Sequence, residues 1–265
     1  MTAPATDEAL WLRRYRPAPE AAARLLCFPH AGGSASYFRP MAEALAPRVE
    51  VVAVQYPGRQ DRFREPCLDS VADLVDRVQP LVASWSDRPL VLFGHSMGSL
   101  LAFELALRLR DGRSGPPVAH LFASGRRGPS TVREETPVHT LDDDGILDDL
   151  ARLGGTDLSL LEDAWLRRTV IDCVRADYRA IETYPCPPDA VLDCPVTVLV
   201  GDDDPKTTLE EAGAWRSHTT GPFARRVFPG GHFYLSERWA EVCAVLGEAF
   251  DGIAAGAVAT RSGSE

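Results

Sequence analysis

The feature that most constrains this chain is the stretch LVLFGHSMGSLLAFELA at residues 90–106. An apolar run typical of a buried strand changes at once into a pattern of helical period, and Ser96 stands at the change between Gly94 and Gly98. In the G-x-S-x-G pattern, a sharp strand-to-helix turn exposes the serine at the edge of an α/β sheet. Side chains at the two glycine positions would collide with the neighbouring strand or helix. The stretch therefore predicts a nucleophilic serine on an α/β scaffold.

Short apolar segments alternate with segments of helical period along most of the chain. Segments that are apolar throughout are typical of strands buried on both faces, as in mostly parallel sheets. Alternation of such strands with helices predicts an α/β fold, with helices on both faces of a mostly parallel central sheet. The predicted strands lie within 23–33, 49–59, 89–94, 118–125, 194–201 and 224–230, and the predicted helices within 70–85, 97–112, 209–218 and 237–250.

The 265 residues suit one domain spanning 1–265, with an insertion. The alternation lapses for about 65 residues after the predicted strand at 118–125, and two helical segments, 141–155 and 163–184, fill the gap. Residues 134–163 hold ten acids against one arginine, which accounts for nearly all of the net charge of −10. Blocks of like charge disfavour tight packing. We therefore predict a surface insertion over 126–190, a helical lid between two core strands.

Composition excludes several classes of protein. The chain has no basic face of the kind that nucleic-acid binding requires. It has no apolar run of about 18 residues for a membrane span and no apolar segment of the secretion-signal type near its first residue, so a cytoplasmic location is expected. The six cysteines are scattered without a C-x-x-C pair, so neither a disulfide framework nor a zinc site is expected.

A serine hydroxyl needs a base, and the rest of the chain has to supply it. In α/β-hydrolases the partners follow the serine in the order acid, then histidine. A predicted strand runs into the acidic loop GDDDP, and its three aspartates, Asp202, Asp203 and Asp204, are all candidates for the acid. His232 follows in the Gly-rich loop after the last predicted strand. We predict that His232 is the base.

Five other histidines compete with His232 for this role. None of them follows the loop that carries the candidate acids, and each is expected to be structural or exposed: His30, His95, His120, His139 and His218.

Two backbone N–H groups should form an oxyanion hole beside the serine. One belongs to the residue after the nucleophile, Met97, and the other to an early Gly-rich loop. The loop PHAGGSA follows the predicted strand within 23–33, and within it we assign this role to Ala31. Donors fixed toward a developing oxyanion matter greatly, because losing one typically costs about 10²–10³ in rate.

Six blocks in order make the chain resemble the type II thioesterases that accompany modular polyketide and nonribosomal peptide synthases, within the α/β-hydrolase superfamily. These blocks are FPHAGGSASYF, VVAVQYPGRQDR, LFGHSMGSLLAFELA, LFASGRRGP, CPVTVLVGDDDP and PGGHFYL. The resemblance extends from about residue 10 to about residue 250. It implies that the acid is the last aspartate of the GDDDP loop, Asp204, a choice that spacing alone leaves open.

The resemblance also implies the substrate and the partner. The substrate would be an acyl group held as a thioester on the phosphopantetheine arm of an acyl or peptidyl carrier protein. No cofactor or metal is implied, and a monomer is the default expectation. Because carrier proteins are usually acidic, we expect docking through basic residues outside the acidic segment; the candidates are Arg59, Arg62, Arg64, Arg126 and Arg127.

Other functions are compatible with the same residues. A carboxylesterase acting on small oxygen esters uses the same set, as does a cofactor-free perhydrolase. A non-catalytic hydrolase-like binding module would be expected to have lost one of these residues, and here all are present.

Overall fold

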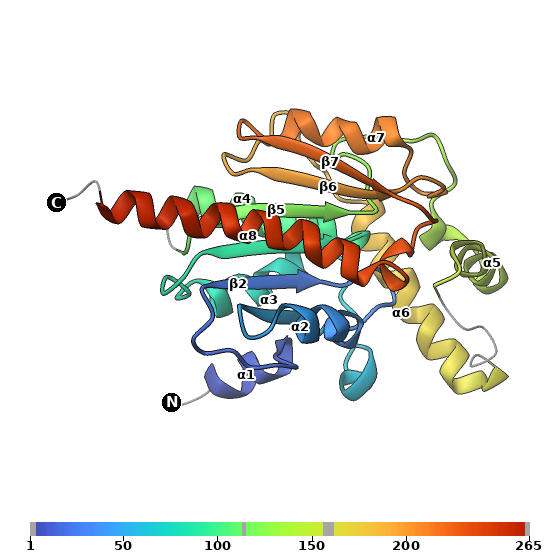
Figure 1. The fold of residues 1–265 in the computed structure, drawn as a ribbon. Coiled ribbons are helices and arrows are strands. Elements are labelled where there is room, and N and C mark those ends of the chain that lie inside the picture. The colour runs from blue at the N-terminus through green and yellow to red at the C-terminus, as the bar shows by residue number, and fades with distance from the viewer. Residues whose placement is uncertain (1–3, 113–114, 156–161, 263–265) are drawn as a thin grey trace.

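The computed structural model describes residues 4–112, 115–155 and 162–262. Seven strands form one sheet in the order β1-β3-β2-β4-β5-β6-β7 (Figure 1). The strands are β1 (Leu12–Arg13), β2 (Ala23–Phe28), β3 (Val49–Val54), β4 (Leu90–His95), β5 (Val118–Ser124), β6 (Val196–Gly201) and β7 (Phe223–Phe228). All neighbouring pairs are parallel except β1–β3. The predicted α/β fold with a mostly parallel sheet is confirmed.

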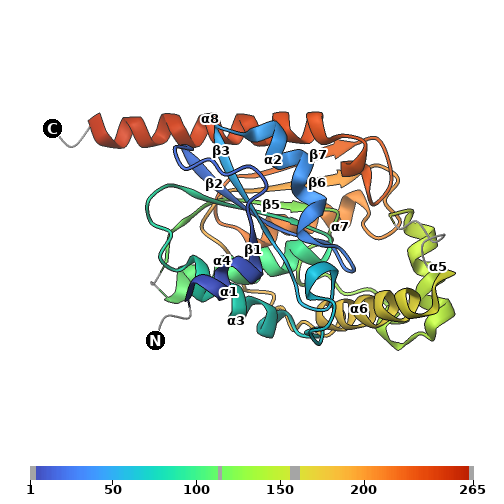
Figure 2. The same ribbon diagram turned by 90° about the horizontal axis from the view of Figure 1, so that it is seen from below.

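Helices cover both faces of the sheet, as the sequence predicts. Side chains alternate along the strands, so that Leu26 and Leu92 face one side and Leu25 and Phe93 the other. Helices α3 (Val71–Val82) and α4 (Met97–Gly112) pack on the first side, and α2 (Arg39–Leu45) and α8 (Trp239–Ser262) on the second. Figure 2 shows the sheet between these two layers. The sequence did not predict α1 (Pro4–Trp11), β1 or α2.

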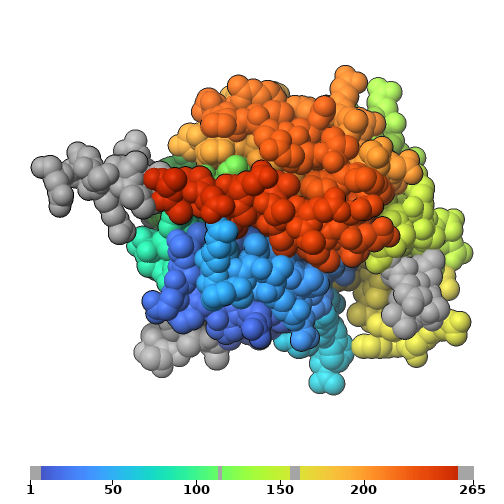
Figure 3. All heavy atoms as spheres, viewed as in Figure 1, coloured from blue at the N-terminus to red at the C-terminus, as the bar shows by residue number. Residues whose placement is uncertain are grey.

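The segment between β5 and β6 contains two helices, α5 (Asp143–Leu153) and α6 (Ala164–Glu182). Both lie at the end of the sheet toward which the parallel strands point. In the space-filling view they form a lobe at that end of the molecule (Figure 3). Ile146 of α5 and Val174 of α6 are buried in the same apolar cluster as α4. The two helices are therefore packed onto the main domain.

No helix in the described part of the chain is both long enough and apolar enough to cross a membrane.

The short helix α7 (Leu209–Gly213) begins at a capping box between Thr208 and Glu211 and precedes the final strand, β7. The carboxyl ends of β4, β6 and β7 are followed by the three loops or turns that carry Ser96, Asp204 and His232. In open parallel sheets, ligands bind at this edge.

Candidate active site

Ser96 occupies a strained turn between β4 and α4. Its φ of 54° is in the left-handed region, which residues with a side chain rarely adopt. A Cβ on Gly94 would lie 2.1 Å from the carbonyl oxygen of Gly98, and a Cβ on Gly98 would lie 1.9 Å from the carbonyl oxygen of Phe28 in β2. Both neighbours are backbone atoms. The turn therefore closes only with glycine at both positions, which explains the pattern in the sequence.

Replacing Gly98 with alanine should lower the free energy of unfolding by more than about 3 kcal/mol, because the clash is with a buried strand that cannot yield cheaply. The matched control is Gly247→Ala in α8, where no atom lies within 4 Å of the added methyl group. That variant should be neutral or about 0.5–1 kcal/mol more stable than the wild type. Urea unfolding measures both, and equal effects would show that the close approach to β2 is unimportant.

Ser96, His232 and Asp204 are joined by hydrogen bonds. The Nε2 atom of His232 lies 3.0 Å from the Oγ atom of Ser96, and its Nδ1 atom lies 2.9 and 3.0 Å from the two carboxylate oxygens of Asp204. His232 is 3% exposed and the Asp204 side chain is fully buried. In such an arrangement the imidazole can take the proton of the hydroxyl while the carboxylate orients the ring and stabilises its charged form.

The structure distinguishes the three candidate acids. Asp202 accepts a hydrogen bond from the Gly230 N–H at 2.9 Å, so it joins its loop to the loop that carries His232. The Asp203 side chain is exposed, and the residue takes part in this junction through its backbone N–H. Asp204 alone of the three faces His232. Its Oδ1 atom also accepts the Lys206 N–H at 2.8 Å, which holds the carboxylate in place.

The other five histidines have different surroundings. In the described part of the chain, none is hydrogen-bonded to Ser96. His95 binds Ser124, His120 binds Thr197, His139 pairs with Glu182, His218 binds Ser130 and the Ala190 carbonyl, and His30 packs against Tyr37 and Phe233.

Two of these histidines lie close to His232 and are held neutral. Burial lowers the pKa of His30 to about 3, with further lowering by His232 and Arg59. Burial also holds the pKa of His95 well below its usual value, again with a contribution from His232. Near neutral pH both rings are therefore uncharged beside the His232 imidazole.

This burial predicts how stability depends on pH. Below about pH 6.5 the histidines of the unfolded chain take up protons that folded His30 and His95 cannot accept, so stability falls as the pH falls from about 6.5 toward 4. The variant His30→Phe should show a shallower decline, by up to about 1.4 kcal/mol per pH unit for the one group removed. Urea unfolding at a series of pH values measures this slope. If the free energy of unfolding fell equally steeply with pH in the two proteins, His30 would not have the lowered pKa described above.

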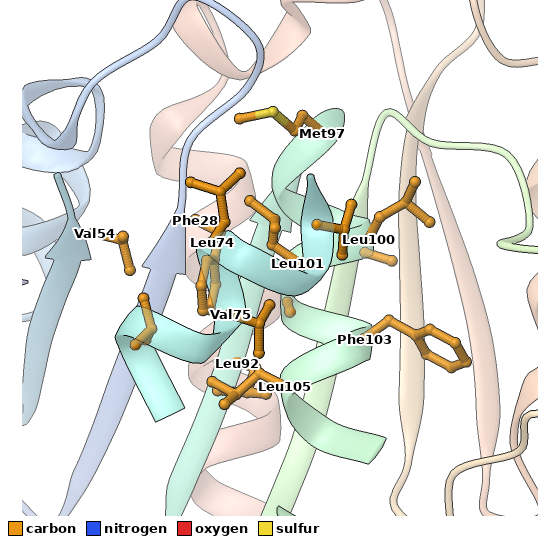
Figure 4. Packing of buried hydrophobic residues seen from close by; sticks show 14 of the residues in the cluster. Phe28, Val54, Leu74, Val75, Leu92, Met97, Leu100, Leu101, Phe103 and Leu105 are labelled. Carbon is orange, nitrogen blue, oxygen red and sulfur yellow. The ribbon is translucent and has the colours of Figure 1, made fainter. Parts of the chain in front are cut away.

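Two backbone N–H groups beside Ser96 are free to bind a ligand. Within the described residues, neither the N–H of Ala31 nor that of Met97 donates a hydrogen bond. Ala31 lines the same pocket as Ser96, and Met97 is the first residue of α4. The Met97 side chain is fully buried among apolar residues at the first turn of that helix (Figure 4). The packing fixes this backbone next to Ser96.

Ser96 and His232 open into a pocket of about 340 Å³. One wall is apolar and comes from α5 and α6, which contribute Leu150, Leu153, Leu166, Val170, Val174 and Tyr178. The four residues from α6 recur at every fourth position, so they form a stripe along one face of the helix. These six residues were not predicted from the sequence as part of the site, although the four-residue spacing of the set from α6 indicates a single helix face. The pocket can accept an apolar group beside the serine hydroxyl.

Asp149 of α5 joins this wall to the loop that carries Asp204. Its carboxylate accepts a hydrogen bond from the Tyr178 hydroxyl of α6 at 2.8 Å and one from the Lys206 ammonium at 2.7 Å. Burial alone would raise the pKa of Asp149, but these two bonds, the charge of Lys206 and a third bond from Arg152 together outweigh it and lower the pKa. The prediction of an acidic segment confined to the surface is therefore wrong at this residue, because Asp149 is buried and compensated by its partners.

Two of the five arginines predicted to dock a carrier protein are not available. Arg59 and Arg62 are 7% and 5% exposed, and they bind Asp177 and Glu65 respectively. That part of the prediction is wrong, because the side chains of these two arginines are buried and bound to groups of the same chain. Arg127 also pairs with Glu135, at 2.8 Å. Arg64 is exposed and lies over the ring of Phe63, and Arg126 is half-buried.

Comparisons with known proteins show that this chain is similar to thioesterases. The family model described as a thioesterase domain matches residues 23–250. The chain is 56% identical over 229 residues to the "Probable cadicidin biosynthesis thioesterase" of Streptomyces griseus, an alignment covering 86% of this chain and 63% of that protein. It is 50% identical over 238 residues to the thioesterase PikA5 of Streptomyces venezuelae, covering 89% and 84% of the two chains.

A solved structure is similar throughout. The type II thioesterase BorB from the borrelidin biosynthetic cluster superposes with a TM-score of 0.82 at 44% identity, covering 91% of this chain and 98% of that one. The family match spans most of the chain, from β2 to the middle of α8. This chain belongs to the thioesterase family of α/β-hydrolases, as its resemblance to type II thioesterases predicts.

Proposed function

We propose that the protein removes acyl groups from the phosphopantetheine arm of carrier proteins in polyketide or nonribosomal peptide biosynthesis, by hydrolysing the thioester. The observation that carries the proposal is the hydrogen-bonded series Ser96–His232–Asp204 at the edge of the sheet, in a chain of the thioesterase family. The similarity to type II thioesterases supports the substrate class.

In the first half of the reaction, Ser96 is the nucleophile. Its Oγ atom bonds to the thioester carbonyl carbon as His232 Nε2 takes the hydroxyl proton, and Asp204 stabilises the imidazolium. The resulting oxyanion accepts hydrogen bonds from the Ala31 and Met97 N–H groups. Collapse of this intermediate breaks the carbon–sulfur bond, and His232 returns the proton to the departing sulfur. The products are an acyl-serine and a free pantetheine thiol.

Water completes the second half. His232 takes a proton from a water molecule, whose oxygen bonds to the acyl carbon of the Ser96 ester, and the oxyanion forms again in the same site. Collapse breaks the ester bond and returns the proton from His232 to the Ser96 oxygen. The acyl group leaves as a carboxylic acid. A thiol has a pKa near 8.5, so it leaves more readily than an alcohol, and the first half favours thioesters.

The α5–α6 segment within residues 126–190 is proposed to act as a lid over the acyl group. The apolar wall from these helices beside Ser96 supports this role. The exposed acids of α5 are partly matched by arginines of α6, as in the pairs Asp143–Arg175 and Asp144–Arg167. We further propose that the protein acts in the cytoplasm, as a monomer, on a carrier protein presented by a synthase.

Hydrolysis of paired substrates tests the proposal. The wild-type protein should hydrolyse a short-chain acyl-carrier protein and the matching acyl-pantetheine, and it should hydrolyse the matching oxygen ester more slowly. A preference for the oxygen ester would favour a carboxylesterase. Faster turnover of the acyl-carrier protein than of acyl-pantetheine at equal concentration would support the carrier as a partner, and equal rates would remove it.

A further inference from the structure

Asp177 of α6 forms a fully buried ion pair that the catalytic steps do not use. Its side chain is 0% exposed, and that of Arg59 is 7% exposed. The two Nη atoms of Arg59 lie 2.7 and 3.0 Å from the two carboxylate oxygens, a bidentate pair. Burial alone would lower the pKa of Arg59, but Asp177 outweighs it and raises the pKa, so the guanidinium stays charged.

The same pair binds the loop that carries Ala31. The N–H of Gly32 donates to the Oδ2 atom of Asp177 at 2.7 Å, and Nη1 of Arg59 donates to the Gly33 carbonyl at 3.3 Å. Gly32 has a φ of 74°, and a Cβ there would lie 2.9 Å from the side chain of Val174. One ion pair therefore binds one backbone group of each of the two residues that follow Ala31, the Gly32 N–H and the Gly33 carbonyl.

A donor contributes to catalysis only while it points at the position that the oxyanion will occupy. The Ala31 N–H lies in a turn outside any helix or strand, so no regular hydrogen-bonding ladder fixes its direction. Bonds to the backbone of the next two residues restrict the rotation of this turn. Because the two charges cost free energy to bury, the pair is a weak source of stability compared with apolar packing. Positioning of the loop is a role that apolar packing could not supply.

We propose that Asp177, with Arg59, is a positioning residue that holds the Ala31 N–H toward the oxyanion. This inference rests on the proposed function in taking Ser96 as the nucleophile and the Ala31 N–H as an oxyanion donor. The ion pair also connects α6 to the loop that carries Ala31, so a displacement of α6 would disturb the Ala31 turn.

The variant Asp177→Asn tests the proposal, because one amide oxygen then faces three donors, the Gly32 N–H and the two Nη groups of Arg59. We expect kcat for thioester hydrolysis to fall about 10–100-fold, with KM within about threefold of the wild type. The matched control is Glu50→Gln, which disrupts another buried pair, with Arg24 at 2.6 Å, between β2 and β3. That variant should lose stability and keep kcat within about twofold.

An alkylboronic acid provides a second readout that does not depend on the natural substrate. The serine oxygen bonds to the boron of such an acid, the boron becomes tetrahedral and anionic, and one of its oxygens occupies the oxyanion hole. Its inhibition constant should rise in Asp177→Asn by about the same factor as kcat falls, and it should not change in Glu50→Gln. A wild-type protein that binds the boronate but hydrolyses only oxygen esters would contradict the proposed function and leave this inference testable.

A second variant covers the possibility that Asp177→Asn fails to fold. The double replacement Arg59→Met with Asp177→Leu removes both charges and restores apolar packing, which is often neutral or stabilising for buried pairs. It should keep the melting temperature within a few degrees and lose kcat and boronate affinity. A folded variant of either kind that retains both kcat and boronate affinity would overturn the proposal.

Discussion

Replacing Ser96 with alanine should lower kcat for thioester hydrolysis by at least about 10⁴-fold. The loss is expected to be this large because the acyl-serine can no longer form, and the remaining residues offer only binding and polarisation of the carbonyl. The fold should be unaffected, since alanine keeps the Cβ atom of serine and therefore the same backbone strain at a φ of 54°. Rates with acyl-pantetheine and thermal unfolding measure the two effects.

A control at a neighbouring hydroxyl separates chemistry from structure. Ser99 lies three residues further along, and its hydroxyl bonds to the Gly94 carbonyl at 2.9 Å and accepts the Ser124 N–H at 3.1 Å. Ser99→Ala therefore removes hydrogen bonds beside the same turn without removing a partner of His232. It should cost stability and leave labelling of Ser96 by a fluorophosphonate intact. Ser96→Ala should abolish that labelling. Activity of the Ser96→Ala protein within tenfold of the wild type would contradict the assignment of the nucleophile.

Replacing Asp204 with asparagine should lower kcat about 10³–10⁴-fold, because an amide leaves the geometry nearly intact but favours the wrong tautomer of His232. The same replacement at Asp203 should leave kcat within about twofold, since that side chain is exposed and does not reach the imidazole. The two variants change neighbouring residues, and their expected kcat values differ by about three to four orders of magnitude. Steady-state kinetics on acyl-pantetheine measure both.

Replacing Asp202 with asparagine should have an effect on kcat between those of the other two variants. Its carboxylate holds the Gly230 N–H, and an asparagine oxygen can still accept that bond, so kcat should fall less than tenfold. If Asp203→Asn or Asp202→Asn lost as much activity as Asp204→Asn, the acid of the series would be misassigned.

The sequence predicted the parts of this structure that depend on local patterns. The turn at Ser96 follows from two glycines at positions where a Cβ meets backbone atoms, a constraint that no neighbouring choice of residue can relieve. The strands around it were predicted because they are buried on both faces and therefore uniformly apolar. The location of His232 followed from the order of the loops along a parallel sheet.

The parts that escaped prediction depend on contacts between distant segments. The choice among the aspartates at 202–204 depends on which side chain faces the next loop, and spacing cannot decide this. Arg59 looked like a surface cation because its partner, Asp177, lies 118 residues away. The acidic segment was predicted to be a surface insertion, and nothing near Asp149 in the sequence shows that this one carboxylate is buried against Lys206 and Tyr178.

Rapid-quench mass spectrometry of the intact protein tests the central claim most directly. After mixing with an acyl-pantetheine, the wild-type protein should carry one acyl group within a single turnover, and fragmentation should locate it on Ser96. His232→Ala should form this adduct far more slowly, because the hydroxyl keeps its proton. Turnover at the full rate with no acyl group on Ser96, or with the acyl group on another side chain, would contradict the account.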